Sequence, residues 1–229
     1  MPIILTVANQ KGGCGKTTTV MNLAGGLTYA KYRVLVVDAD PQASATIWSL
    51  AQGQGSLPFD VSTVRQVGGR FQHLLKLPYD IILIDTPPGI ADSGDDAAKF
   101  ARVAIAGSDA ILMPLRPSTL DFSAARTFVR YLASHKAKET KAALLLNGVD
   151  HTSLSREAPA AAEQLFAPIA GGVVFSTTIG RRAAITEVSG SGKTIFDFRP
   201  SHAATLEYAQ LTKEIIQWLA PAHTLHPSA

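Results

Sequence analysis

The sequence is poor in cysteine, since Cys14 is the only one among its 229 residues. A single cysteine excludes an intrachain disulfide framework, a C-x-x-C redox pair and a four-cysteine zinc site. The six histidines show no H-E-x-x-H or comparable ligand spacing, so we do not expect a zinc enzyme either.

Long apolar runs are also missing, because no stretch approaches the roughly eighteen uninterrupted apolar residues of a membrane-spanning helix. The first residues lack the basic, apolar and small-residue order of a signal peptide. We therefore expect a cytoplasmic protein that does not use a membrane. The net charge of +3 and the pI near 9.0 are compatible with a polyanionic partner without requiring one.

The regular feature of the sequence is an alternation of short apolar runs with helical patterns. Continuous apolar runs are typical of strands that are covered on both faces by helices. The alternation predicts an α/β fold with one doubly wound, mostly parallel sheet flanked by helices. The expected strands are 3–8, 33–38, 79–85, 110–115, 142–149 and 173–175, and the expected helices are 17–30, 95–106, 121–134, 155–166 and 202–219. We expect a single domain over residues 1–219, a surface loop at 51–58 and a flexible tail at 220–229.

A glycine-rich loop follows the first expected strand and leads into the first expected helix. Such a loop lets the backbone approach phosphate oxygens, and the helix N-terminus adds a positive dipole end. In this position Lys16 would reach the β and γ phosphates of a nucleotide, and the Thr17 hydroxyl would complete a Mg²⁺ shell. The residues predicted to surround the phosphates are Lys11, Gly12, Gly13, Cys14, Gly15, Lys16, Thr17 and Thr18.

A second Gly-Lys-Thr sequence, at residues 192–194, lacks this context. Glu187 occupies the place of the first glycine, and a polar, helix-like segment precedes the sequence instead of a buried strand. We interpret residues 190–194 as a turn that leads into residues 195–198.

Three acids follow two other expected strands. Asp85 ends one strand, where an acid is well placed to hold Mg²⁺ through water. Asp38 and Asp40 end another, and we assign Asp40 to orienting the attacking water and Asp38 to Mg²⁺ and loop geometry. Each acid alone is equally well explained as a cap or a turn residue, but the three together indicate a phosphate site.

These motifs resemble those of the deviant Walker A ATPases. The matching segments are Lys11-Gly12-Gly13-Cys14-Gly15-Lys16-Thr17-Thr18, Asp38-Ala39-Asp40-Pro41-Gln42 and Asp85-Thr86-Pro87-Pro88. Within that superfamily the chain is similar to the ParA partition proteins, and its residues 114–125 are similar to those of the small ParF-type members. The resemblance extends from about residue 3 to residue 219.

The resemblance implies a role for the lysine that precedes the glycines. In similar proteins this lysine, here Lys11, contacts the ATP of the partner subunit in a nucleotide-sandwich dimer. ATP would then favour the dimer by binding it better than the monomer. The resemblance also places Asn147 near the nucleobase, Pro200 in a loop that touches adenine, and residues 87–89 with Asp92 in a switch that senses the γ phosphate.

Similar proteins bind nucleoid DNA without sequence preference in their ATP state. The candidate DNA contacts here are Arg181, Arg182, Lys193 and Arg199, with Arg126, Arg130, Lys136, Lys138 and Lys141 as a second group. Two-fold symmetry would double the phosphate contacts of such a patch. A solvated charged surface explains any one of these residues equally well.

The function expected from the resemblance is a Mg²⁺-dependent ATPase, binding ATP and ADP, that segregates a plasmid or chromosome region. A centromere-binding adaptor, of which a ribbon-helix-helix protein is one type, would stimulate slow hydrolysis by the nucleoid-associated dimer. Positioning of another cargo, such as a microcompartment or a chemoreceptor cluster, stays open. A MinD-like membrane cycle would want a basic amphipathic terminal helix, which residues 220–229 do not offer.

Overall fold

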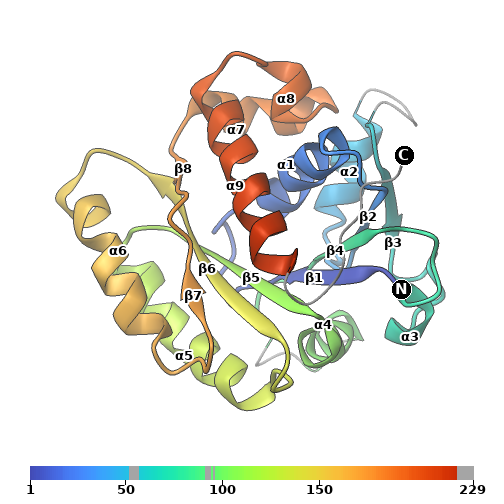
Figure 1. The fold of residues 1–229 in the computed structure, drawn as a ribbon, viewed down its shortest axis with the longest axis horizontal. Coiled ribbons are helices and arrows are strands. Elements are labelled where there is room, and N and C mark those ends of the chain that lie inside the picture. Colours follow the sequence, from blue (N-terminus) through green and yellow to red (C-terminus); the bar gives the residue numbers. More distant parts are fainter. Residues whose placement is uncertain (52–56, 91–93, 95, 221–229) are drawn as a thin grey trace.

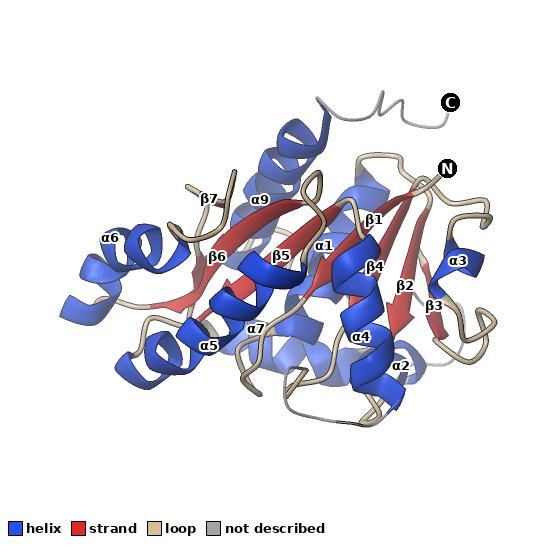
Figure 2. Ribbon diagram, turned by 90° about the horizontal axis from the view of Figure 1, so that it is seen from below, coloured by secondary structure: helices blue, strands red, loops and turns tan. Residues whose placement is uncertain are grey.

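The chain forms a parallel sheet between two layers of helices, as Figures 1 and 2 show for the computed structural model. The structure describes residues 1–51, 57–90, 94 and 96–220. The strand order is β3-β2-β4-β1-β5-β6-β7, with β8 paired to β6, and every recorded strand pairing is parallel. The predicted doubly wound α/β fold is confirmed.

The strands have the following bounds. They are β1 (Ile3–Val7), β2 (Val34–Asp38), β3 (Asp60–Thr63), β4 (Ile81–Asp85), β5 (Ala110–Leu115), β6 (Lys141–Val149), β7 (Val173–Val174) and β8 (Ile179–Gly180). All five residues of β1, β2 and β4 are buried, as are all six of β5. This burial explains why these strands read as continuous apolar runs.

Helices cover both faces of the sheet. They are α1 (Lys16–Tyr29), α2 (Ser44–Leu50), α3 (Phe71–Leu74), α4 (Asp96–Gly107), α5 (Thr119–His135), α6 (Ser153–Phe166), α7 (Ala183–Glu187), the short 3₁₀ helix η1 (Val188–Ser191), α8 (Ile195–Phe198) and α9 (Ala203–Leu219). Helices α4, α5 and α6 lie on one face, and α1, α2, α7 and α9 lie on the other (Figure 2). No helix in the described part of the chain is both long enough and apolar enough to cross a bilayer.

The two helical layers pack on alternate residues of the same strands. Leu5 and Val7 of β1 belong to the core beneath α1 and α9, where Tyr208 is fully buried. Ile4, between them in the sequence, packs on the opposite face with Phe71 and Phe100. The carboxyl ends of β1, β2 and β4 therefore form one edge that is fixed from both sides, and ligands bind at this edge in such sheets.

Several elements differ from the sequence-based expectation. The strand β3, the strand β8 and the short helices α2, α3 and α7 were not predicted. Of the segment predicted as a turn at residues 190–194, Gly190 and Ser191 belong to the 3₁₀ helix η1, and Gly192 turns the chain with a positive φ of 64° before α8 begins at Ile195. Of the loop expected at 51–58 and the tail expected at 220–229, residues 52–56 and 221–229 lie outside the described residues.

Candidate functional site

The glycine-rich loop joins β1 to α1 at the carboxyl edge of the sheet. Gly15 is the N-cap of α1 with a φ of 93°, and no side chain caps the helix there. The first N–H groups of an α-helix have no partner inside the helix, so an uncapped N-terminus is suited to an anion. A Cβ on Gly15 would lie 2.0 Å from the amide nitrogen of Asn147, so the loop conformation requires glycine.

The outer side of the loop is open. A Cβ on Gly12 or on Gly13 would meet no atom within 4 Å, and both residues are exposed. Packing inside the protein therefore does not require glycine at position 12. The open space lies beside the N-terminus of α1, which is where the phosphates of a bound nucleotide would lie.

Lys16 points back into the loop. Lys16 is only 6% exposed, and its Nζ donates to the Lys11 carbonyl at 3.2 Å. The Cys14 thiol donates to the same carbonyl at 3.3 Å, and burial raises the pKa of this thiol. The structure thus places one buried cation inside the loop and makes Cys14 a packing residue in place of a reactive one.

Lys11 lies on the outer side of the loop and pairs with an acid from a different element. Its ammonium group forms an ion pair with Asp121, whose side chain is 4% exposed while that of Lys11 is 39% exposed. Asp121 lies in the first turn of α5, where Ser118 is the N-cap and accepts from the Asp121 N–H at 3.2 Å. No sequence motif predicted a role for Asp121.

Two asparagines hold the loop in place. Asn147, at the carboxyl end of β6, donates from Nδ2 to the Cys14 carbonyl at 2.8 Å. Asn9 donates to the Pro114 carbonyl at 2.7 Å and accepts from the Lys11 N–H at 3.2 Å. The amide nitrogen of Asn147 thus binds the loop in this structure, and its contact with a nucleobase stays a prediction. Asn9 was missed because a single asparagine after a strand is an ordinary turn signal.

The three predicted acids lie beside the loop because their strands are neighbours. Asp85 is opposite Val7 of β1 on one side and opposite Asp38 of β2 on the other. Both oxygens of Asp38 accept hydrogen bonds: Oδ2 accepts from the N–H and the hydroxyl of Thr46, both at 2.8 Å, and Oδ1 accepts from the Asp40 N–H at 3.1 Å. Asp38 therefore fixes the start of α2, and its part in holding Mg²⁺ stays a prediction.

Asp85 is in the opposite situation. It is fully buried, and neither carboxylate oxygen has a hydrogen bond of good geometry within the described residues. Burial raises the pKa of Asp85 to about 7, and nearby Asp38 adds to the rise, while the Thr17 hydroxyl and Lys16 oppose it. A buried polar group without a partner calls for an ion or a water molecule.

These residues fit a Mg²⁺ ion that is shared with a nucleotide. Within the described ranges no three acid, histidine or cysteine side chains converge as a complete metal site. Mg²⁺ commonly takes one or two protein ligands and completes its shell with water and phosphate oxygens. Thr17 and the unpartnered Asp85 are at the place where such an ion would bind.

Asp40 lies further out, after the end of β2. It is half-buried, and Oδ1 accepts from the Gln42 N–H at 2.9 Å in a turn that leads to Ala43, which has a positive φ of 52°. Its second oxygen makes no hydrogen bond in the described part of the chain. This oxygen is free to accept from a water molecule.

The remaining predicted residues are placed as follows. Thr18 is half-buried in the first turn of α1, and Pro200 is exposed in the turn between α8 and α9. The expected switch is tied to the loop, because the Gly89 N–H donates to the Gln10 carbonyl at 2.9 Å. Asp92 lies outside the described residues.

The predicted DNA contacts divide into two surfaces. Arg181, Arg182, Lys193 and Arg199 lie around α7 and α8, whereas Arg126, Arg130, Lys136 and Lys138 of the second group lie on and just after α5, on the other face of the sheet. Lys141 begins β6 and donates from Nζ to the Trp218 carbonyl of α9 at 2.5 Å. Arg182 pairs with Glu207, and Arg199 lies 3.6 Å from Glu187. Arg181 and Lys193 are exposed and have no ion pair among the described residues.

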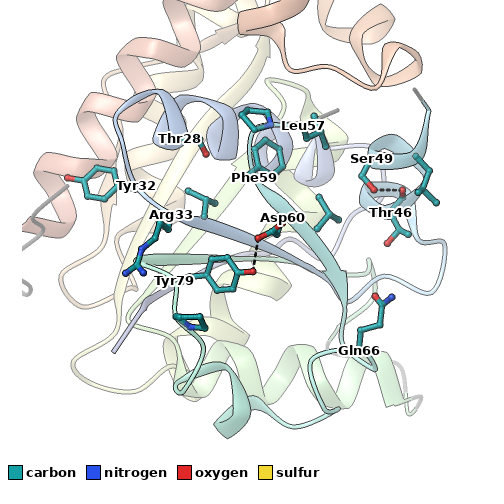
Figure 3. Close-up of a pocket in the computed structure, with 15 residues that line it drawn as sticks. Thr28, Tyr32, Arg33, Thr46, Ser49, Leu57, Phe59, Asp60, Gln66 and Tyr79 are labelled. Atoms are coloured by element: carbon teal, nitrogen blue, oxygen red, sulfur yellow. Dashed lines mark hydrogen bonds between the residues drawn. The ribbon is translucent and has the colours of Figure 1, made fainter. Parts of the chain in front are cut away.

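A cavity of about 850 Å³ lies away from this site, at the sheet edge formed by β3 (Figure 3). Its walls come from the C-terminal end of α1, from α2 and from β3. The Tyr79 hydroxyl donates to Asp60 at 2.7 Å, and both residues line the cavity. None of the predicted site residues lines it. Thr46 lies in its wall and bonds to Asp38, so the cavity adjoins the site through one side chain.

The family follows from the sequence comparison. Residues 5–195 match the family described as the CobQ/CobB/MinD/ParA nucleotide binding domain. The chain belongs to this family. Its membership confirms the predicted relationship to ParA and MinD ATPases and identifies the loop between β1 and α1 as part of a nucleotide-binding domain.

Two relatives that are named for different functions resemble the chain over nearly its whole length. The chain is 32% identical over 230 residues to the "Maintenance of carboxysome distribution protein A" of Gloeobacter kilaueensis, covering 93% of this chain and 94% of that protein. It is 26% identical over 246 residues to the chromosome-partitioning ATPase Soj of Thermus thermophilus, covering 93% and 95%.

A solved structure of the family shows the same fold. The septum site-determining protein MinD of Pyrococcus horikoshii, solved as a complex with Mg-ADP, superposes with a TM-score of 0.72 at 17% identity. The superposition covers 98% of this chain and all of that one. At this identity the likeness concerns the fold.

Proposed function

We propose that this chain is a Mg²⁺-dependent positioning ATPase whose ATP-bound form is a dimer on nucleoid DNA. The observation that carries the proposal is the pair of lysines in one phosphate loop, with Lys16 buried inside it and Lys11 half-exposed on its outer side. One cation serves the loop's own phosphates, and the other is available to a second set of phosphates.

Nucleotide binding would use the backbone of the loop and the N-terminus of α1. The open side of Gly12 and Gly13 gives access to the phosphates, and Lys16 would exchange its bond to the Lys11 carbonyl for the β and γ phosphates. Thr17 and Asp85 would hold Mg²⁺, which neutralises charge on the phosphate oxygens. Because Mg²⁺ binding needs an ionised carboxylate, it would lower the raised pKa of Asp85.

Hydrolysis would need a positioned water molecule. Asp40 is the candidate, since one of its oxygens is fixed by the Gln42 N–H and the other is free. A carboxylate held in this way orients a water for attack on the γ phosphate without being strongly basic. The two lysines would stabilise the charge on the transferred phosphoryl group, and turnover would be slow until a partner improves this arrangement.

Dimerisation would require Lys11 to leave Asp121. The ion pair keeps the ammonium group of the monomer on its own α5, so the lysine reaches a second nucleotide only after this contact breaks. ATP in the partner subunit would supply the replacement anion. Nucleotide binding and dimerisation are thereby linked through one side chain.

DNA binding would depend on the exposed basic residues around α7 and α8. Arg181 and Lys193 are the stronger candidates, because Arg182 and Arg199 each pair with a carboxylate, whereas Arg181 lies near Asp150 without forming an ion pair with it. A dimer presents such a patch twice, so the affinity for duplex DNA would rise when ATP is bound.

Two cargoes are supported by the relatives. The 32% identical relative is named for carboxysome distribution, which favours a microcompartment cargo. The 26% identical relative is named for chromosome partitioning, which favours a plasmid or chromosome region with a centromere-binding adaptor. The gene next to this one discriminates between them, because a small ribbon-helix-helix DNA binder would indicate partition.

The central experiment measures dimerisation by sedimentation velocity with a slowly hydrolysed ATP analogue and Mg²⁺. Wild-type protein and the matched control Lys76→Ala, an exposed lysine after α3, are expected to dimerise. Lys16→Ala is expected to lose nucleotide binding and the dimer, whereas Lys11→Ala is expected to keep monomer binding and lose only the dimer. A Lys11→Ala protein that dimerises like the wild type would refute the proposed role of this lysine.

Asp40→Ala gives an independent test of the chemistry. This variant is expected to form the ATP dimer and to release phosphate much more slowly than the wild type, because the attacking water loses its acceptor. Normal phosphate release would remove Asp40 from the mechanism.

A binding experiment with duplex DNA and with anionic vesicles, each added to the ATP-loaded protein, distinguishes a nucleoid-bound protein from a membrane-cycling one.

A further inference from the structure

A groove of about 420 Å³ runs between α5 and α6, on the sheet face opposite α1 and α9. Phe122 and Val129 of α5, Leu165 of α6 and Pro168 just after α6 give it an apolar floor.

Two arginines flank this floor without a partner. Arg126 and Arg130 are exposed, lie one helical turn apart on α5, and make no hydrogen bond or ion pair through their side chains with any described residue. Other arginines of the chain do have acids, such as Arg33 with Asp80 and Arg182 with Glu207. Glu163 of α6 is exposed and forms no ion pair with either arginine.

We propose that the α5–α6 groove docks an amphipathic helix of a partner protein, with apolar side chains on the floor and acidic side chains on Arg126 and Arg130. Helices recognised in grooves present anchors at i, i+3, i+4 and i+7, which suits an apolar groove between two helices. The arginines select acidic partners and speed their association. DNA would satisfy the two arginines but would leave the apolar floor without a contact.

The groove is connected to the phosphate loop through α5. Phe122 lines the groove, and the preceding residue, Asp121, holds Lys11. A helix seated in the groove therefore contacts the element that positions Lys11. The identification of this helix with the adaptor that stimulates hydrolysis rests on the proposed function, whereas the docking itself does not.

The test uses the full chain without nucleotide and a display library of random 16-residue peptides. Peptides that carry acidic and apolar residues at helical spacing are expected to be enriched, and their affinities are then measured by fluorescence anisotropy. Affinity should fall at least tenfold for the double variant Arg126→Glu/Arg130→Glu. The control Arg65→Glu/Arg70→Glu makes the same charge change at exposed arginines between β3 and α3, and should leave affinity unchanged.

A second variant blocks the groove without removing an arginine. Ala161 of α6 lines the groove and is half-buried, so Ala161→Glu places a carboxylate beside Arg126 and Arg130 and occupies the space. This variant should also lose at least tenfold in peptide affinity, while its thermal melt and its nucleotide binding stay close to those of the wild type.

Three results would overturn the proposal. They are failure to enrich acidic, apolar peptides; enrichment of peptides that bind the groove variants as well as the wild type; and loss of 30-base-pair duplex binding in Arg126→Glu/Arg130→Glu with the peptides unaffected. Because the selection uses no nucleotide, its outcome is independent of whether Lys11→Ala loses the ATP dimer.

Discussion

The ion pair between Lys11 and Asp121 makes a quantitative prediction about dimer strength. Asp121→Asn keeps the size and shape of the side chain and removes the charge that holds Lys11. An ion pair of this kind contributes about 1 kcal/mol when one partner stays partly exposed, as Lys11 does. Both copies must release their lysine in the dimer, so the total is about 2 kcal/mol, which corresponds to about a 30-fold change in the dimer dissociation constant.

Asp121→Asn is therefore expected to dimerise about 30-fold more tightly than the wild type in the presence of a slowly hydrolysed ATP analogue. The assay is sedimentation velocity across a concentration series. Asp96→Asn is the matched control, because it removes an equal charge from an exposed acid that pairs with Lys99 at 2.9 Å in α4. This control should leave the dissociation constant unchanged.

The double variant Lys11→Ala/Asp121→Asn decides the cause of the effect. If Asp121 acts by holding Lys11, the second substitution gives no gain once the lysine is absent, and the double variant dimerises as poorly as Lys11→Ala. Tighter dimerisation in the double variant would show that Asp121 acts by another route. A dissociation constant for Asp121→Asn that equals or exceeds that of the wild type would refute the reasoning altogether.

Three further predictions concern the rest of the site. Lys16→Ala should weaken ADP binding by at least about 100-fold in calorimetry, since it removes the buried cation inside the loop. Burial raises the pKa of Asp85 from 3.8 to about 7, so between these pH values the folded protein binds a proton that the unfolded chain has lost, and the stability of the nucleotide-free protein falls as the pH rises. Asp85→Asn lacks this titration, so its melting temperature should rise relative to that of the wild type from pH 5 to pH 8. A difference in melting temperature that stays constant over this range would contradict the raised pKa. Arg181→Glu should reduce duplex binding by the ATP-loaded protein more than Arg182→Glu, because Arg182 is already paired with an acid, and fluorescence anisotropy measures both.

The central strands and the phosphate loop were predictable because their signals are local. A buried strand such as β4 is a continuous apolar run, and the loop between β1 and α1 has glycines where positive φ angles occur. The strand β3 escaped prediction because none of its four residues is buried, so its sequence has no apolar run. The helix α2 escaped because its start depends on contacts with Asp38 and on an alanine with positive φ, in place of a side-chain cap.

Long-range partners could not be read from the sequence. Lys11 and Asp121 are 110 residues apart, and Asn147 and Cys14 are 133 residues apart, so only the strand order brings each pair together. The difference between Asp38 and Asp85 is of the same kind. Both end buried strands, yet Thr46 satisfies one carboxylate and nothing in the described residues satisfies the other.

The proposed function needs a surface that selects the cargo in addition to the nucleotide site. Relatives named for carboxysome distribution and for chromosome partitioning match more than nine tenths of this chain, so under the proposed function the shared fold alone would not select the cargo. Selection then requires a surface that differs in chemistry from a phosphate site and still communicates with it. Helix α5 meets both conditions, because its first turn holds Lys11 through Asp121 and its next turns present an apolar floor beside two unpaired arginines. A partner that binds this helix differently in the monomer and in the dimer would change the dimer equilibrium by that difference in binding free energy.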